Sequence, residues 1–316
     1  MLSSLYLISF YNSKLKEKIT QEKIVFNKIP AFTPFPYPLI SNVLSTNDSK
    51  SELEFTYASS EKIESPEISS EGAIIMDNDS KVILYAKNEK LRFSMASTTK
   101  IMTALVALDY FKMDDILTVK TENVDGAVVG FSEGERIYFK DMLYAMLLPS
   151  GNDVALAIAE NYKGGKELFI KKMNEKAIQL NLYNTHFSDS TGLFDDGDYT
   201  TVFDLAHLSS IAMENKIIQE IVGTKNKVIS TVDGKNKYVL NNLNKLLGFY
   251  GVEGIKTGFT EEAGGILATS KIEYGENKEE HRLIIVVMKS QDRFEDTKKL
   301  LSFINGKVKY LDLSSN

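Results

Sequence analysis

Proline divides this chain into two unequal parts. Five of its six prolines lie within the first 66 residues, and the remaining one is Pro149. Proline fixes φ and has no backbone N–H to donate, so the stretch "IPAFTPFPYPLISN" can form neither a helix nor a central strand. The stretch after it is polar, rich in Ser and Glu, and offers little apolar material for a core. We therefore expect residues 1–68 to form a tether, residues 69–306 a folded domain and residues 307–316 a short tail.

The expected domain begins with strands and continues with helices. Apolar runs at 73–76 and 82–85 flank the turn-forming sequence Asp-Asn-Asp-Ser, which predicts a β-hairpin. Apolar residues then recur at helical spacing from Ser97 to about Lys112, and most of 141–220 has the same spacing. Helices are therefore expected to dominate the middle of the chain.

Strands return near the C-terminal end of the domain. The runs at 252–259, 264–274 and 282–290 are strand-like, and a closing helix ends at Asn305-Gly306, a suitable C-terminal cap. This order is not the alternating β-α-β pattern of a parallel sheet. We expect an α+β fold, in which one antiparallel sheet is assembled from both ends of the domain and flanked by helices. An inserted all-helical subdomain is expected at about 111–225.

Composition excludes several kinds of site. The net charge of −6 and the pI near 5.4 give no basic balance that would favour nucleic acid as a partner. The chain has no cysteine, which excludes disulfides, thiolate metal sites and a cysteine nucleophile. The histidines, His186, His207 and His281, do not have the spacing of a zinc site. We expect neither a metal nor an organic cofactor.

The first residues of the chain contain a short apolar run, Leu2 to Tyr11. A helix that spans a bilayer needs roughly 20 apolar residues, so this run is too short to cross one. Its length suits the core of an export signal, although no Lys or Arg precedes it. We interpret it as a remnant of an export signal or anchor, and any membrane tether is expected at this N-terminal end.

Three short motifs occur in order along the domain: Ser-x-x-Lys at 97–100, Ser-x-Asn at 150–152 and Lys-Thr-Gly at 256–258. The first two patterns also occur by accident elsewhere in the chain, whereas Lys-Thr-Gly occurs once. Context separates them from accidental matches. The Ser-x-x-Lys motif is at the start of an expected helix, Ser-x-Asn is on an interhelical loop after Pro149, and Lys-Thr-Gly is on an expected strand.

The order and surroundings of these motifs resemble the D-alanyl-D-alanine carboxypeptidases, which are low-molecular-weight penicillin-binding proteins. The resemblance rests on the stretches "MASTTKIMTALVAL", "LLPSGNDVALAIAE", "NTHFSDSTGLFD", "YTTVFDLAHLS", "NNLNKLLG" and "VEGIKTGFTEEAGG". It runs from about Gly72 to Ile304 and leaves the first 70 residues unexplained. It implies a β-lactamase/transpeptidase-like fold and a location outside the cytoplasm, in the cell envelope.

Serine needs a base in order to attack an amide carbonyl, and the lysine one helical turn after Ser97 is the available base. Lys100 can accept a proton only as a neutral amine, so its pKa must be lowered by burial or by a neighbouring cation such as Lys256. We assign Ser97 as the nucleophile and Lys100 as the general base. Ser150 is expected to relay a proton to the leaving nitrogen.

The remaining motif residues are expected to bind substrate. Asn152 would hold the peptide backbone of the substrate, and Lys256 would bind its terminal carboxylate. Thr257 would add a hydroxyl to that contact beside Gly258. The family pattern implies that the backbone N–H groups of Ser97 and Phe259 form the oxyanion hole.

The resemblance implies acylation of Ser97 by a peptidoglycan stem pentapeptide, release of the terminal D-alanine and then hydrolysis, with β-lactams trapping the acyl-enzyme. Two positions depart from the family pattern. Phe259 stands where many members carry a larger polar residue, and Ile266 stands where many carry cysteine.

Other readings remain open. A serine β-lactamase is disfavoured, because the loop reads Ser-Gly-Asn and the chain has neither a Glu-x-x-Leu-Asn segment nor a Tyr-x-Asn triplet. A catalytically idle penicillin-binding sensor or scaffold is a second alternative. An endopeptidase or a transpeptidase would share the acyl-enzyme and differ only in the acceptor.

Overall fold

The computed structural model describes residues 64–121, 124–193, 197–274 and 280–308. The chain divides into two units, Met1–Lys62 and Ile63–Asn316, and all described residues belong to the second. The expected tether therefore lies almost entirely outside the described residues, as does most of the expected tail. The expected domain boundaries remain predictions.

The strands of the described ranges are β1 (Gly72–Asp77), β2 (Ile83–Lys87), β3 (Phe93–Ser94), β4 (Ile116–Thr118), β5 (Arg136–Tyr138), β6 (Tyr199–Thr200), β7 (Asn226–Ser230), β8 (Lys237–Asn241), β9 (Val252–Thr260), β10 (Gly264–Tyr274) and β11 (Glu280–Ser290). The helices are η1 (Ala96–Thr98, a 3₁₀ turn), α2 (Thr99–Leu108), α3 (Phe139–Leu147), α4 (Asn152–Asn161), α5 (Gly165–Gln179), α6 (Val202–Glu214), α7 (Lys216–Val222) and α8 (Arg293–Ile304).

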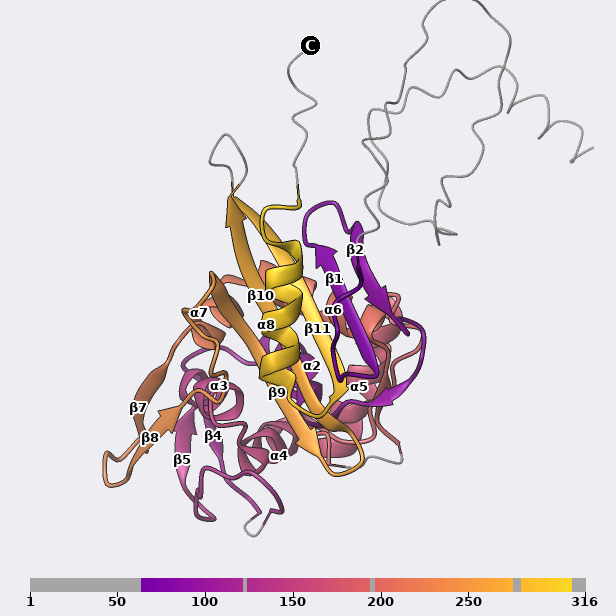
Figure 1. Ribbon diagram of the computed structural model, residues 1–316. Helices are drawn as coiled ribbons and strands as arrows, with labels where there is room; N and C mark the ends of the chain where they lie inside the picture. Colours follow the sequence, from indigo (N-terminus) through magenta and orange to yellow (C-terminus); the bar gives the residue numbers. More distant parts are fainter. Residues whose placement is uncertain (1–63, 122–123, 194–196, 275–279, 309–316) are drawn as a thin grey trace, which may run out of the picture. The chain divides into compact units, whose positions relative to one another are not determined.

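One antiparallel sheet organises the domain. Its five strands have the order β2-β1-β11-β10-β9, so strands from the two ends of the domain meet where β1 pairs with β11. The hairpins β1–β2 and β10–β11 flank that junction, and β9 forms one edge. Figure 1 shows the indigo strands of the chain's start beside the yellow and orange strands of its end. The α+β class expected from the sequence is confirmed.

The two faces of the sheet bury alternate residues of the same strands. Ile74 and Met76 of β1 join the larger core with the buried faces of α2 and α6, whereas Ala73 and Ile75 join a smaller core under α8. Alternation with a period of two residues is what a strand covered on both faces requires. In Figure 1, α8 crosses one face of the sheet and α2 and α6 lie behind it.

The nucleophile motif lies at the centre of the larger core. Every residue of α2 from Thr99 to Ala107 is buried, so this helix has no solvent-facing side. A helix that is buried on all sides is typical of a protein interior. Lys100 is therefore buried in the core because it belongs to this helix, and the preceding turn, η1, packs against the edge strand β9.

The inserted region at 111–225 is mainly helical but not all-helical as expected: it also contains the short strand β6, which pairs with β3, and a two-stranded pair that we did not predict. In that pair β4 and β5 are antiparallel, and each buries one central residue, Leu117 and Ile137. Strands of three residues are too short to show an alternating pattern in a sequence. None of the described helices is both long and apolar enough to span a bilayer.

Candidate active site

Ser97 lies in a tight turn between β3 and α2. The turn is the 3₁₀ segment η1, and the residue before the serine, Ala96, has φ = 43°, in the left-handed region. Such a conformation costs a non-glycine residue free energy and recurs at functional sites. Gly192 packs directly on this turn: a Cβ at that glycine would lie 1.8 Å from the carbonyl oxygen of Ala96. The turn at 96–98, called the nucleophile turn below, is thus packed tightly against the segment that contains Gly192.

Three oxygen atoms surround the amino group of Lys100. The Nζ atom lies 2.9 Å from Ser97 Oγ, 2.6 Å from Asn152 Oδ1 and 2.7 Å from the carbonyl oxygen of Thr191. The last two oxygens can only accept hydrogen bonds, whereas a serine hydroxyl can also donate one. A neutral amine would therefore direct both of its N–H bonds to Asn152 and Thr191. Its lone pair then faces the hydroxyl of Ser97.

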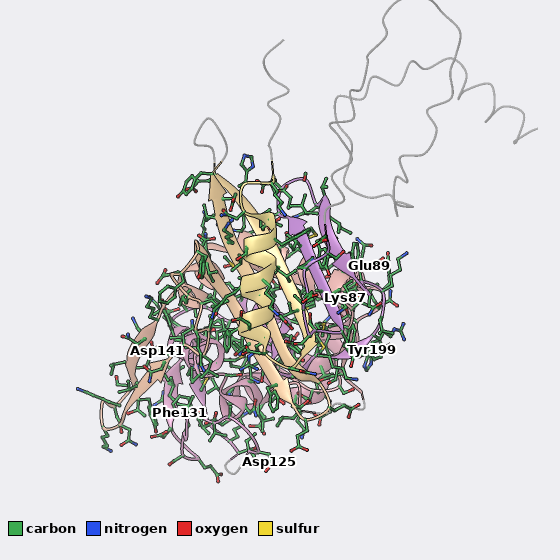
Figure 2. All side chains as sticks on the ribbon, viewed as in Figure 1. Lys87, Glu89, Asp125, Phe131, Asp141 and Tyr199 are labelled. Carbon is green, nitrogen blue, oxygen red and sulfur yellow. The ribbon has the colours of Figure 1, made fainter. Side chains whose placement is uncertain are left out.

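The orientation of the Asn152 amide follows from its other contact. Its Nδ2 donates to the carbonyl oxygen of Asp125 at 2.7 Å, so Oδ1 must face Lys100. Asp125 and Phe131, both labelled in Figure 2, lie in the loop between β4 and β5. Asn152 was expected to bind the substrate backbone. In this structure both ends of its amide are engaged by the protein, so it also positions Lys100.

Burial sets the proton affinity of Lys100. The side chain is completely buried, and this burial lowers the pKa of its amino group to about 7. The carboxylates of Asp189, Asp153 and Asp198 act in the opposite direction and raise that pKa. Of the two causes expected from the sequence, burial is the larger at Lys100, and the repulsion between Lys100 and Lys256 acts in the same direction. A lysine with a pKa near neutrality can work as a general base.

A second buried lysine holds the second serine. Lys256 Nζ lies 2.9 Å from Ser150 Oγ and donates to the carbonyl oxygen of Thr257, also at 2.9 Å. Burial lowers the pKa of Lys256 well below its ordinary value, and repulsion from Lys100 and Arg293 lowers it further. Ser150 has φ = 70°, so both serines lie in or beside left-handed backbone. This site therefore holds two Lys–Ser pairs.

The Lys-Thr-Gly motif is on β9, the edge strand of the sheet. Thr257 is buried, whereas the ring of Phe259 is 63% exposed. Arg293, the first residue of α8, donates from Nη1 to the carbonyl oxygen of Gly258 at 2.7 Å. An edge strand has backbone groups free for another chain, and here the basic side chains of Lys256 and Arg293 lie beside it.

The structure brings together, in one cluster, two hydrogen-bonded groups, Ser97–Lys100–Asn152 and Ser150–Lys256, which the loop from Ser150 to Asn152 connects, with Thr257, Gly258 and Phe259 on the strand that carries Lys256. The roles assigned to these residues remain predictions. Sequence reasoning missed Arg293, Thr191 and Asp189, which reach the cluster only through the fold. No group of three or more His, Asp or Glu side chains that could hold a metal ion occurs within the described ranges.

Comparison with known proteins places this cluster in context. A family model described as D-alanyl-D-alanine carboxypeptidase matches residues 59–292. The D-alanyl-D-alanine carboxypeptidase DacF of Bacillus subtilis is 37% identical over 206 residues, which are 63% of this chain and 53% of that protein. A D-alanyl-D-alanine endopeptidase of Pseudomonas aeruginosa is 32% identical over 207 residues, 64% of this chain and 66% of that protein. The chain thus matches only about half of the length of the first of these relatives.

A solved structure shares the fold. The Streptomyces K15 DD-transpeptidase aligns with a TM-score of 0.71 and 31% sequence identity, covering 76% of this chain and 98% of that chain. The β-lactamase/transpeptidase-like fold that the motifs implied is therefore confirmed. The names of these similar proteins include a carboxypeptidase, an endopeptidase and a transpeptidase.

Proposed function

Because the chain belongs to the D-alanyl-D-alanine carboxypeptidase family, we propose that it is a serine-type carboxypeptidase of the peptidoglycan. It removes the terminal D-alanine from stem pentapeptides through an acyl-enzyme on Ser97, and β-lactams inhibit it by acylating the same serine. The observation that carries this proposal is the 2.9 Å contact between Lys100 Nζ and Ser97 Oγ, with the other neighbours of the amine restricted to accepting.

Acylation begins at the first Lys–Ser pair. Lys100, as a neutral amine, takes the hydroxyl proton of Ser97 while Oγ forms a bond to the carbonyl carbon of the D-Ala–D-Ala peptide. The resulting oxyanion accepts hydrogen bonds from the backbone N–H groups of Ser97 and Phe259, a contribution that typically changes rates on the order of 10²- to 10³-fold. The turn at η1 brings the first of these donors against the strand that carries the second.

Collapse of the tetrahedral intermediate needs a proton on the leaving nitrogen. Ser150 supplies it from its hydroxyl, and Lys256, 2.9 Å away, restores that proton. Free D-alanine leaves, and the peptide remains esterified to Ser97. The proton that Lys100 took from Ser97 replaces the one that Lys256 gave up, so Lys100 is a neutral amine again. Water then attacks the ester, Lys100 accepts a proton from the water and passes it to Ser97 Oγ, and the shortened peptide is released. Each step uses only groups of the described cluster and water.

The site recognises the substrate by its terminal carboxylate. The side chains of Lys256 and Arg293 lie at the edge strand, Thr257 adds a hydroxyl on the same strand, and a bound carboxylate favours the protonated form of Lys256. Charge-assisted hydrogen bonds to a carboxylate are stronger than neutral ones. The substrate backbone then pairs with the free edge of β9 as an added strand. These contacts favour a peptide with a free C-terminus.

The acceptor distinguishes the related activities. Water gives a carboxypeptidase or an endopeptidase, and an amine of another peptide gives a transpeptidase. The names of the relatives cover all three activities. We propose the carboxypeptidase for two reasons: Lys256 and Arg293 suit the free carboxylate of a terminal residue, which disfavours an endopeptidase, and the matching family model is described as a carboxypeptidase. The proposed partners are peptidoglycan stem peptides and β-lactams, and the proposed location is the cell envelope.

The test combines labelling with product analysis. Purified protein is incubated with a fluorescent penicillin, and the adduct is mapped by mass spectrometry beside Ser97→Ala. We expect an adduct on Ser97 and none on the variant, together with D-alanine release from a soluble pentapeptide. An adduct on another residue would overturn the mechanism. Rapid hydrolysis of penicillin without D-alanine release would favour a β-lactamase, and no labelling at all would favour an idle scaffold.

A further inference from the structure

A carboxylate outside the predicted motifs organises the turn that contacts Lys100. Asp189 is 8% exposed and accepts hydrogen bonds from the backbone N–H of Thr191, from Thr191 Oγ1 at 2.7 Å, from Gly192 N at 2.6 Å and from Leu193 N at 3.2 Å. A buried carboxylate is costly unless hydrogen bonds compensate for its lost hydration. The segment after Asp189 therefore folds back over its own carboxylate.

These hydrogen bonds fix the direction of the Thr191 carbonyl group. With its N–H and hydroxyl directed to Asp189, Thr191 points its carbonyl oxygen at Lys100 Nζ, 2.7 Å away. Gly192, with φ = +83°, lets the same turn pack against the carbonyl of Ala96. The turn thus touches both the residue that precedes the nucleophile and the proposed base.

We infer that Asp189 is a positioning residue for the general base, because it holds the Thr191 carbonyl where one N–H of Lys100 must point and so directs the lone pair of the amine to Ser97. This inference rests on the proposed function, since it needs Lys100 to act as the base. If the carbonyl moved, the neutral amine could rotate, and its lone pair would leave the hydroxyl of Ser97.

Asp189 is not the only carboxylate whose charge acts on Lys100. The charges of the carboxylates of Asp189, Asp153 and Asp198 act on Lys100, and Lys100 and Lys256 repel each other when both are protonated. Asp153 accepts from the backbone of the loop at 129–131, and Asp198 accepts from the backbone N–H of Ser188. Of the three carboxylates, Asp189 is the one that bonds to the turn holding the Thr191 carbonyl. Asp198→Asn is therefore a control that changes charge near Lys100 and removes a hydrogen bond to Ser188, which precedes that turn.

The test compares Asp189→Asn with Asp198→Asn. The measured quantity is the rate constant for acylation by a fluorescent penicillin, followed over a pH range that brackets the pKa of Lys100 at about 7. Either substitution removes a negative charge and so lowers the pKa of Lys100. Both variants should therefore show the acid limb of the profile at lower pH. Only Asp189→Asn should also lose about tenfold in the rate on the alkaline plateau.

A purely structural role for Asp189 gives a different result. Partial unfolding reduces the fraction of protein that becomes labelled but leaves the plateau rate constant of the labelled fraction unchanged. That outcome, or a plateau rate equal to that of Asp198→Asn, overturns the inference. If Asp189→Asn does not fold, Thr191→Val decides, because it removes the hydroxyl donated to Asp189 and keeps the carbonyl. An unchanged plateau rate in Thr191→Val then overturns the inference.

The wild-type protein separates this inference from the proposed function. Absence of labelling in the wild type overturns both. Normal labelling of the wild type on Ser97, with a normal plateau rate in Asp189→Asn, overturns the inference and leaves the carboxypeptidase proposal standing.

Discussion

Lys256 lies with its amino group 2.9 Å from the hydroxyl oxygen of Ser150, the same distance that separates Lys100 from Ser97. The two pairs differ in what surrounds the lysine. Carboxylates face Lys100 and raise its pKa against burial, whereas Lys256 faces the cations Lys100 and Arg293. A substrate carboxylate arriving at Lys256 would supply the missing negative charge there. Its arrival would favour the proton on Lys256 and, by repulsion, the neutral form of Lys100.

Lys100→Met tests the general base. Methionine fills a similar volume but has no lone pair on nitrogen, so acylation by a fluorescent penicillin should fall about 10³-fold. The carbonyl of Thr191 and Oδ1 of Asn152 would lose a donor, which should lower the free energy of unfolding by about 1–3 kcal/mol. Thermal melting checks that the variant is folded. Lys140→Met, at an exposed position on α3, is the control and should label normally.

The pH dependence of acylation should report the titration of Lys100. Burial lowers its pKa to about 7, and only the neutral amine can accept the proton of Ser97. The rate should therefore rise with pH and level off above neutrality. One pH unit below the pKa, about a tenth of the amine is neutral, so the rate should be about tenfold lower. A flat profile through this region would show that Lys100 is not the base.

The motifs predicted the part of the site that local geometry controls. Ser97 and Lys100 are three residues apart, so helical geometry alone puts them on one face. Ser150 and Lys256 are 106 residues apart, and family resemblance was needed to pair them. Asp189 and Arg293 belong to no motif; each acts through a backbone carbonyl, of Thr191 and of Gly258, whose direction only the fold determines.

The sheet could be predicted for a similar reason. Long strands such as β10 and β11 show clear apolar runs, and the order of strands and helices excludes a parallel sheet. The short strands β4 and β5 each bury one residue, which leaves no pattern to detect. Pairing between β1 and β11 follows from tertiary packing and not from any local signal.

Arg293→Gln tests recognition of the substrate carboxylate. Removing this cation should raise KM for D-alanine release from a soluble pentapeptide about tenfold and change kcat little, because the contact is made equally in the ground and transition states. A pentapeptide with a C-terminal amide should not distinguish the variant from the wild type. Arg282→Gln, which breaks an ion pair with Glu253, is the control. A fall in kcat with unchanged KM would contradict the assignment.

Asp296→Ala tests how the start of the domain is held. The Asp296 carboxylate on α8 accepts from Ser69 N at 2.8 Å, Ser69 Oγ at 2.7 Å, Ser70 N at 2.7 Å and Ser290 Oγ at 2.6 Å. Its loss leaves buried donors without an acceptor and should lower the free energy of unfolding by about 3 kcal/mol. Chemical denaturation measures this, with exposed Glu295→Gln as the control. A loss of unfolding free energy no larger than that of the control would mean that the hydrogen bonds to Asp296 do not stabilise the domain.

The same carboxylate should make stability depend on pH. Burial would raise the pKa of Asp296, but the hydrogen bonds from Ser290, Ser69 and Ser70 outweigh it and hold that pKa below its ordinary value. A group with a lowered folded pKa stabilises fully above its unfolded pKa, about 3.9 for Asp, and loses that contribution as the pH falls through the folded pKa. The wild type should therefore lose more stability in acid than Asp296→Ala. Parallel curves would contradict this.

Gly192→Ala tests the contact of Gly192 with the nucleophile turn. Its Cβ would lie 1.8 Å from the carbonyl oxygen of Ala96, and its backbone has φ = +83°, so both a clash and strain follow. Gly134→Ala is the matched control, because φ is +85° there and no atom lies within 4 Å of the added Cβ. Strain alone costs about 1–2 kcal/mol, which both variants share. Only Gly192→Ala also pushes Ala96, and with it Ser97, away from Lys100. We expect Gly134→Ala to have a slightly lower melting temperature than the wild type and to be acylated at the wild-type rate. Gly192→Ala should have a much lower melting temperature and be acylated far more slowly. Equal acylation rates in the two variants would mean that the conformation of the nucleophile turn does not depend on its contact with Gly192.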